Sequence, residues 1–136
     1  MRALLVTLVV LLALPSGPAL APTPAERAIR SVILDQMVAF QENDGPTAFA
    51  IASPSIQAKL RDPETFMHMV ATAYPQVYRP KKVVFLDLLR TNDRTIQRVL
   101  LHGPDEQTVT ALYFMILIDG RWRIDGCMLV QPETRT

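Results

Sequence analysis

The sequence is poor in cysteine, in glycine and in excess charge of either sign. Its 136 residues include one cysteine, Cys127, and five glycines. A single cysteine excludes an intramolecular disulfide, so the fold must depend on its apolar core. Lysine and arginine number 14 and aspartate and glutamate 13, which leaves a formal net charge of +1. This balance argues against a general binder of nucleic acid or of anionic membranes, because both need a basic excess.

The longest apolar run lies at the N-terminus. Arg2 supplies a positive charge, residues 3–14 are apolar except for Thr7, and the proline-containing residues 15–18 end the run. This is the three-part order of a secretory signal peptide. A helix of that length spans about 18 Å, well short of the ~30 Å hydrocarbon core of a membrane. The run therefore predicts a cleaved signal and no stable membrane anchor after cleavage.

Small residues at Ala19 and Ala21 offer two positions for cleavage, and both remain open at this point. We expect a signal peptide over residues 1–21 and a periplasmic or secreted protein. The remaining residues 22–136 have the usual length of one domain. A chain of this length buries enough surface to fold without a metal or disulfide.

The first half of residues 22–136 shows the three- and four-residue apolar spacing of helices. The spacing predicts a long amphipathic helix over residues 25–42. Its apolar stripe consists of Ile29, Val32, Ile33, Met37 and Phe40. A shorter helix with Phe49 and Ile51 follows, then a further turn, and Asp62 with Pro63 begins a third helix.

After residue 75 the apolar spacing becomes that of extended strands. Strands are predicted over residues 82–89, 95–101, 108–118 and 121–130. The Asp119-Gly120 pair between the last two predicts a two-residue hairpin turn, because both positions favour positive φ. Helices followed by an antiparallel meander indicate an α+β fold with helices packed on one sheet.

Several segments resemble the small bacterial family known as domain-of-unknown-function family 4864. They are residues 28–33, 35–36, 49–57, 62–64, 66–67, 74–80, 97–99, 111–113 and 122–127. The order of the elements also resembles the cone-shaped nuclear transport factor 2-like superfamily, also called cystatin-like or SnoaL-like. The resemblance implies a curved four-stranded antiparallel sheet, a bacterial exported setting and no assigned activity. This chain departs from the family at residues 114–118, which are apolar where the family is mostly polar.

The connector over residues 74–80 is the strongest local candidate for a ligand-binding rim. Prolines stiffen it, and it carries Tyr74, Tyr78 and Arg79. In a cone-shaped fold a pocket lies between the helices and the sheet, so this connector could line its mouth. The alternative is that both tyrosines are boundary residues with buried rings and solvated hydroxyls.

Arg98, Tyr113 and Arg123 fall on three different predicted strands. If they share one face of the sheet, they form a cationic, hydrogen-bonding floor suited to a carboxylate-bearing ligand. A bulge at Gly126 would change which face each side chain occupies.

Asp35 is the candidate for a catalytic role that the superfamily resemblance implies. In superfamily members with isomerase or cyclase activity, a carboxylate directed into the cavity acts as a general base. No motif places a histidine or second acid beside Asp35 or Gln36 here, and a helix-surface role is the alternative. His68 and His102 belong to no spaced metal-ligand set, so we predict no metal and no cofactor.

The third predicted strand has no charged side chain over residues 111–118. Alternation places Leu112, Phe114, Ile116 and Ile118 on one face and Ala111, Tyr113, Met115 and Leu117 on the other. Two apolar faces on one strand favour a homodimer through the sheet. The alternative is that helices of the same chain cover both faces. Cys127, on the last strand, is expected to be buried and inert.

The sequence therefore predicts an exported domain that binds a small ligand or a protein partner without catalysis. One alternative is an isomerase, cyclase or dehydratase that uses the cone pocket with an Asp35-type base. The other is a structural accessory subunit.

Overall fold

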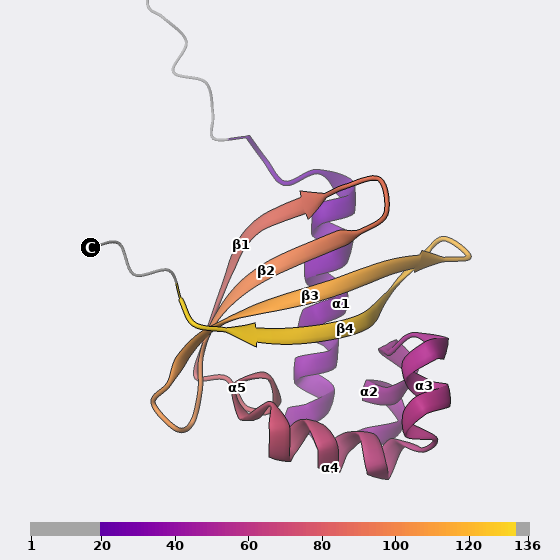
Figure 1. Cartoon of the computed structure of the whole chain (residues 1–136), viewed down its shortest axis with the longest axis vertical. Helices are drawn as coiled ribbons and strands as arrows, with labels where there is room; N and C mark the ends of the chain where they lie inside the picture. Colours follow the sequence, from indigo (N-terminus) through magenta and orange to yellow (C-terminus); the bar gives the residue numbers. More distant parts are fainter. Residues whose placement is uncertain (1–19, 133–136) are drawn as a thin grey trace, which may run out of the picture.

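The computed structural model describes residues 20–132, and these residues form helices followed by a sheet (Figure 1). The α+β fold class predicted from the sequence is confirmed. Nearly all of the predicted signal peptide, including the cleavage position at Ala19, lies outside the described residues. Within the described range, no helix combines the length and the apolar character needed to span a membrane.

Helix α1 (Pro24–Gln41) is the long helix that the apolar spacing predicts. It begins at Thr23, whose hydroxyl accepts a hydrogen bond of 3.2 Å from the backbone N–H of Glu26. The predicted stripe is buried at Ile29, Ile33, Met37 and Phe40. In Figure 1 the helix runs behind the sheet, so its apolar side packs toward the strands.

Three further helices follow, α2 (Gly45–Ile51), α3 (Pro54–Leu60) and α4 (Pro63–Ala73). Each has a proline in its first two positions. Each is also capped by a side chain that accepts a hydrogen bond from a backbone N–H in the first turn; the capping residues are Asp44, Ser53 and Asp62 respectively. The sequence predicted only a turn where α3 forms a helix. It also missed α5 (Pro75–Tyr78), where a stiff connector was expected. The proline at the start of α5 is compatible with the first turn of a helix, which explains why it begins there.

The sheet consists of β1 (Lys82–Arg90), β2 (Thr95–His102), β3 (Thr108–Ile118) and β4 (Arg121–Val130), each antiparallel to its neighbour in sequence order. The predicted meander is confirmed, with β1 and β2 each one residue longer than expected. Asp119 and Gly120 have φ values of 50° and 76°, as a two-residue hairpin turn requires.

Both edge strands contain a bulge. In β1 the register shifts between Phe85 and Leu88, and the side-chain amide of Gln97 donates to the freed carbonyl of Leu86 at 3.0 Å. In β4 Asp125 is the extra residue, because Phe114 pairs with Gly126 and Met115 pairs with Ile124. Bulges bend strands and increase their twist. They also decide the face that each later side chain occupies.

The helices lie on one side of the sheet (Figure 1). The side of β3 that faces them buries Ala111, Tyr113 and Met115. The opposite side carries Phe114, which is half-buried, and Ile116, which is 38% exposed. The alternative in which helices of the same chain cover both faces is therefore wrong for the described residues.

Candidate functional site

A cavity of about 380 Å³ lies between the helices and the covered face of the sheet. Side chains from α1, α3, α4, α5, β3 and β4 form its wall. Most of that wall is apolar and includes Phe40, Ile56, Leu60, Phe66, Met69 and Val70. Pockets that bind small molecules have the same character, an apolar wall with a few placed polar groups.

The cavity's floor is formed by the pair Tyr113 and Cys127, which lie opposite each other on β3 and β4. Tyr113 is 1% exposed, and its hydroxyl has no hydrogen-bond partner among the described residues. A buried polar group without a partner costs about 1–3 kcal/mol of stability. Such a group is unusual in a native protein and marks a position that packing alone does not explain.

Burial keeps both floor groups uncharged. Desolvation, with a smaller contribution from the Cys127 thiol, raises the pKa of Tyr113 well above its usual value of 10.0. Desolvation also raises the pKa of Cys127 from 9.0 to about 12. Near neutral pH the floor therefore presents a phenol and a thiol, both protonated. The residue Cys127 is half-buried, so the predicted full burial is wrong, whereas the raised pKa agrees with the predicted inertness of the thiol.

Gln36, on α1, is the polar residue that forms the opposite part of the wall. It is buried, and its side-chain amide donates a hydrogen bond of 3.1 Å to the backbone carbonyl of Ala48 on α2. Its neighbour Asp35 is exposed and lines a different depression between α1, α2 and the β3–β4 turn. The hypothesis that Asp35 points into the cavity is therefore wrong, because the helical repeat turns Asp35 outward and Gln36 inward.

The charged residues that line the cavity are Lys59 and Asp125, and both are exposed. They are opposite in sign. Asp125 Oδ1 accepts a hydrogen bond of 2.6 Å from the hydroxyl of Ser53, which ties the bulge of β4 to the start of α3. This junction holds one side of the cavity in place.

The predicted rim over residues 74–80 is divided by the structure. Tyr74 lines the cavity. Tyr78 instead packs its ring against Phe40, with ring centroids 5.7 Å apart. Arg79 lies over the Tyr78 ring and donates hydrogen bonds to the carbonyl of Gln41 at 2.8 Å and to Asn43 Oδ1 at 3.0 Å. Tyr78 and Arg79 therefore secure the C-terminal end of α1.

The structure does not bring Arg98, Tyr113 and Arg123 together. Tyr113 lies in the cavity floor, whereas Arg98 donates a hydrogen bond of 2.7 Å to Asp87 beside the β1 bulge. Arg123 donates to the carbonyl of Ala50 on α2 at 2.6 Å, outside the cavity. Gln97, Val99 and Leu101 of β2 are buried and point toward the helices. Arg98 alternates with them, so its side chain lies on the opposite face of the sheet. The expected cationic floor is therefore absent from the cavity wall.

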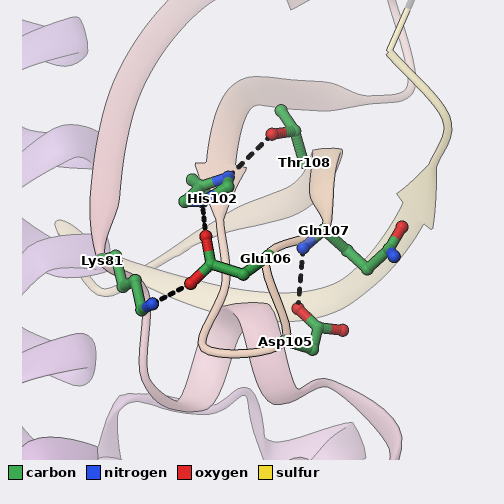
Figure 2. Close-up of polar contacts among 6 residues, drawn as sticks. All are labelled: Lys81, His102, Asp105, Glu106, Gln107 and Thr108. Carbon is green, nitrogen blue, oxygen red and sulfur yellow. Dashed lines mark hydrogen bonds and ion pairs between the residues drawn. The ribbon is translucent and has the colours of Figure 1, made fainter.

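A second polar cluster lies at the β2–β3 turn (Figure 2). None of its residues lines the cavity. The Glu106 carboxylate bridges Lys81 and His102, with 3.0 Å between Glu106 Oε2 and His102 Nε2. His102 Nδ1 lies 2.9 Å from Thr108 Oγ1, and Asp105 accepts from the side chain of Gln76 at 2.8 Å. The hydrogen bonds from Lys81, and next from His102, lower the pKa of Glu106.

This cluster stabilises the turn. Its charged residues Lys81, Asp105 and Glu106 are exposed, and the buried Gln76 anchors it to α5. Across residues 20–132, no three His, Cys, Asp or Glu side chains are grouped as metal ligands would be. His68 is exposed on α4.

A family model described as a domain of unknown function (DUF4864) matches residues 22–136. The match begins at the residue after the predicted signal peptide. No curated protein matches the chain. The site must therefore be interpreted from its own geometry.

Proposed function

Since this chain belongs to the DUF4864 family, whose description assigns no activity, we propose from the geometry that it is a small-ligand binding module. The observation that carries the proposal is the cavity of about 380 Å³ between the helices and the sheet. A volume of this size lies within the range of roughly 300–1,000 Å³ that is typical of ligand pockets. The accessory-subunit alternative predicts a filled core at this position.

The apolar wall supports binding by shape and burial. Phe40, Phe66 and Val70 are fully buried at this wall, while Ile56 and Leu60 are half-buried. A ligand that covers the exposed parts of Ile56 and Leu60 gains roughly 25 cal/mol for each Å² of apolar surface removed from water. A cavity also reduces the stability of the protein, because its lining loses contacts. Retention of such a cavity favours a function over a purely structural role.

Binding without catalysis is favoured by the charges around the cavity. The enzyme alternative needs a general base inside the pocket, and Asp35 lies outside it. The acid that does line the cavity, Asp125, is exposed and accepts the Ser53 hydrogen bond. The described lining residues include no histidine. The proposed binding requires neither a metal nor a cofactor.

We further propose that the fold is the cone of the nuclear transport factor 2-like superfamily. Three observations support this: helices precede the sheet, the four strands form an antiparallel meander, and bulges interrupt both edge strands. An experimental structure superposed on superfamily members tests this proposal. A sheet that diverges from theirs in strand order or in the side covered by helices would contradict it.

Native mass spectrometry of the protein purified from the compartment to which it is exported tests the function. We expect a small molecule to remain bound to the wild-type protein through purification. Ile56→Trp, which adds volume at the cavity wall, should lose that mass, whereas Ile51→Trp, at the other depression, should keep it. Wild-type protein without an added mass, or Ile56→Trp with the same mass, would overturn the proposal.

A further inference from the structure

We infer that the ligand of this cavity is an uncharged, mostly apolar molecule with one hydrogen-bond-accepting oxygen, such as a carbonyl, and that this oxygen binds the hydroxyl of Tyr113. The inference rests on the proposed function, because it concerns the same cavity. It differs from the sequence-based expectation of a carboxylate-bearing ligand, which depended on two arginines that the structure places elsewhere.

The absence of charge in the ligand follows from the groups around the cavity. Gln36 and Tyr113 are the buried polar side chains of the wall, and Cys127 beside them is half-buried. None of the three is charged near neutral pH. Lys59 and Asp125 have opposite signs and are exposed, so they remain in water. A ligand carboxylate in the interior would lose its hydration without gaining a buried cation, which is strongly unfavourable.

The acceptor oxygen follows from the hydrogen bonds that the wall already makes. One of the two amide N–H groups of Gln36 donates to the carbonyl of Ala48. The Tyr113 hydroxyl, by contrast, is the one fully buried side-chain nitrogen or oxygen that lacks a partner among the described residues of the cavity wall. Because its proton is retained, it can donate. A carbonyl oxygen accepts that bond in surroundings where few water molecules compete.

The hydroxyl is sealed in the structure, since Tyr113 as a whole is 1% exposed. An oxygen therefore reaches it only if neighbouring side chains of the wall shift slightly. Met69 lines the same cavity and has the flexible, unbranched side chain that adapts to such changes. The ligand oxygen then accepts the hydrogen bond that the Tyr113 hydroxyl cannot make within the protein.

Three naphthalenes of similar shape test the inference: 2-acetylnaphthalene, 2-isopropylnaphthalene and 2-naphthoate. Their affinities are measured by titration of the purified protein, followed by the NMR signals of its methionine methyl groups. We expect the ketone and the hydrocarbon to bind and the carboxylate to bind at least about tenfold more weakly than the ketone.

The variant Tyr113→Phe removes only the hydroxyl. We expect it to reduce the ratio of ketone to hydrocarbon affinity by about tenfold. The matched control is Tyr78→Phe, which removes a hydroxyl from a tyrosine that does not line the cavity and should leave the ratio unchanged. Without a ligand, Tyr113→Phe should melt at a higher temperature than the wild type, because a buried unpaired group is removed.

The outcomes separate the inference from the proposed function. If none of the three compounds binds, the inference fails, and the proposed function fails with it only if native mass spectrometry also finds no small molecule on the purified protein. If the hydrocarbon binds but the affinity ratio is the same in Tyr113→Phe, the function stands and the role of Tyr113 is overturned. Equal binding of naphthoate and ketone overturns the uncharged ligand. A lower melting temperature of Tyr113→Phe shows that the hydroxyl has a partner in the protein and also overturns the inference.

Discussion

The hydroxyl of Ser53 lies 2.6 Å from Asp125 Oδ1, and this hydrogen bond joins the start of α3 to the bulge of β4. Ser53 is fully buried, and its oxygen also accepts the backbone N–H of Ile56 at 3.3 Å. Its own N–H donates to the carbonyl of Ile124 at 2.8 Å. One residue therefore caps a helix and attaches it to the sheet, beside the cavity.

Ser53→Ala should lower the free energy of unfolding by about 1–2 kcal/mol, because it removes a helix cap and leaves Asp125 without its donor. Urea denaturation measures the change. The control is Ser55→Ala, an exposed serine in the same helix, which should change stability by less than about 0.5 kcal/mol. Equal effects of the two substitutions would show that the Ser53–Asp125 bond contributes nothing.

Cys127 should react slowly with a bulky thiol reagent in native protein at about pH 8, because burial raises the pKa of its thiol to about 12. Denaturant should restore rapid labelling. Rapid labelling of the native protein would contradict the burial of this thiol.

The same pKa predicts how stability depends on alkaline pH. The pKa of Cys127 is higher in the folded state than its ordinary 9.0, so its contribution to stability is fully present below pH 9.0. That contribution is lost as the pH rises toward about 12. Urea denaturation at several pH values should show a smaller alkaline loss of stability for Cys127→Ala than for the wild type. An identical alkaline loss in both proteins would show that the thiol is solvated.

We propose that a second copy of the chain covers the outer face of the sheet. The helices leave this face uncovered in the described residues, and several large apolar side chains on it are more than one third exposed. They are Val84, Leu89, Ile116 and Met128. Contiguous apolar patches beyond a few hundred Å² are rare on soluble monomers. Light scattering at micromolar concentration should therefore report a dimer.

Phe114→Lys should convert that dimer to a monomer, because Phe114 lies on the outer face above Gly126. Tyr113→Lys on the other face of the same strand is not a suitable comparison, because Tyr113 is buried in the cavity floor and the change would disturb the core. Leu34→Lys is a better control, because Leu34 is 42% exposed on α1. A wild-type monomer, or an equal effect of Leu34→Lys, would contradict the proposed interface.

Export should remove residues up to Ala19 or Ala21. The expectation comes from the apolar run over residues 3–14 and the small residues that follow it. N-terminal sequencing of protein recovered from outside the cytoplasm measures the cleavage position. Recovery of soluble exported protein with Met1 intact would contradict it.

Local sequence determined where the helices and strands lie. Thr23 and Asp62 cap helices because their side chains accept backbone N–H groups three residues later, an interaction that needs no distant partner. Asp119 and Gly120 form the last hairpin turn because they tolerate positive φ. Helix α5 was missed because its four residues are too few for a periodic apolar pattern.

Tertiary structure decided which side chains meet. The sequence placed Tyr113 and Cys127 on neighbouring strands, but only the register of β3 with β4 sets them opposite each other in the floor of a cavity. Strand alternation alone left the faces of Arg98 and Arg123 open. The register of β2 directs Arg98 outward. Arg123, on the edge strand β4, donates to the carbonyl of Ala50 on α2. Long-range packing sets these positions, because a shift of one residue along a strand moves a side chain to the other face.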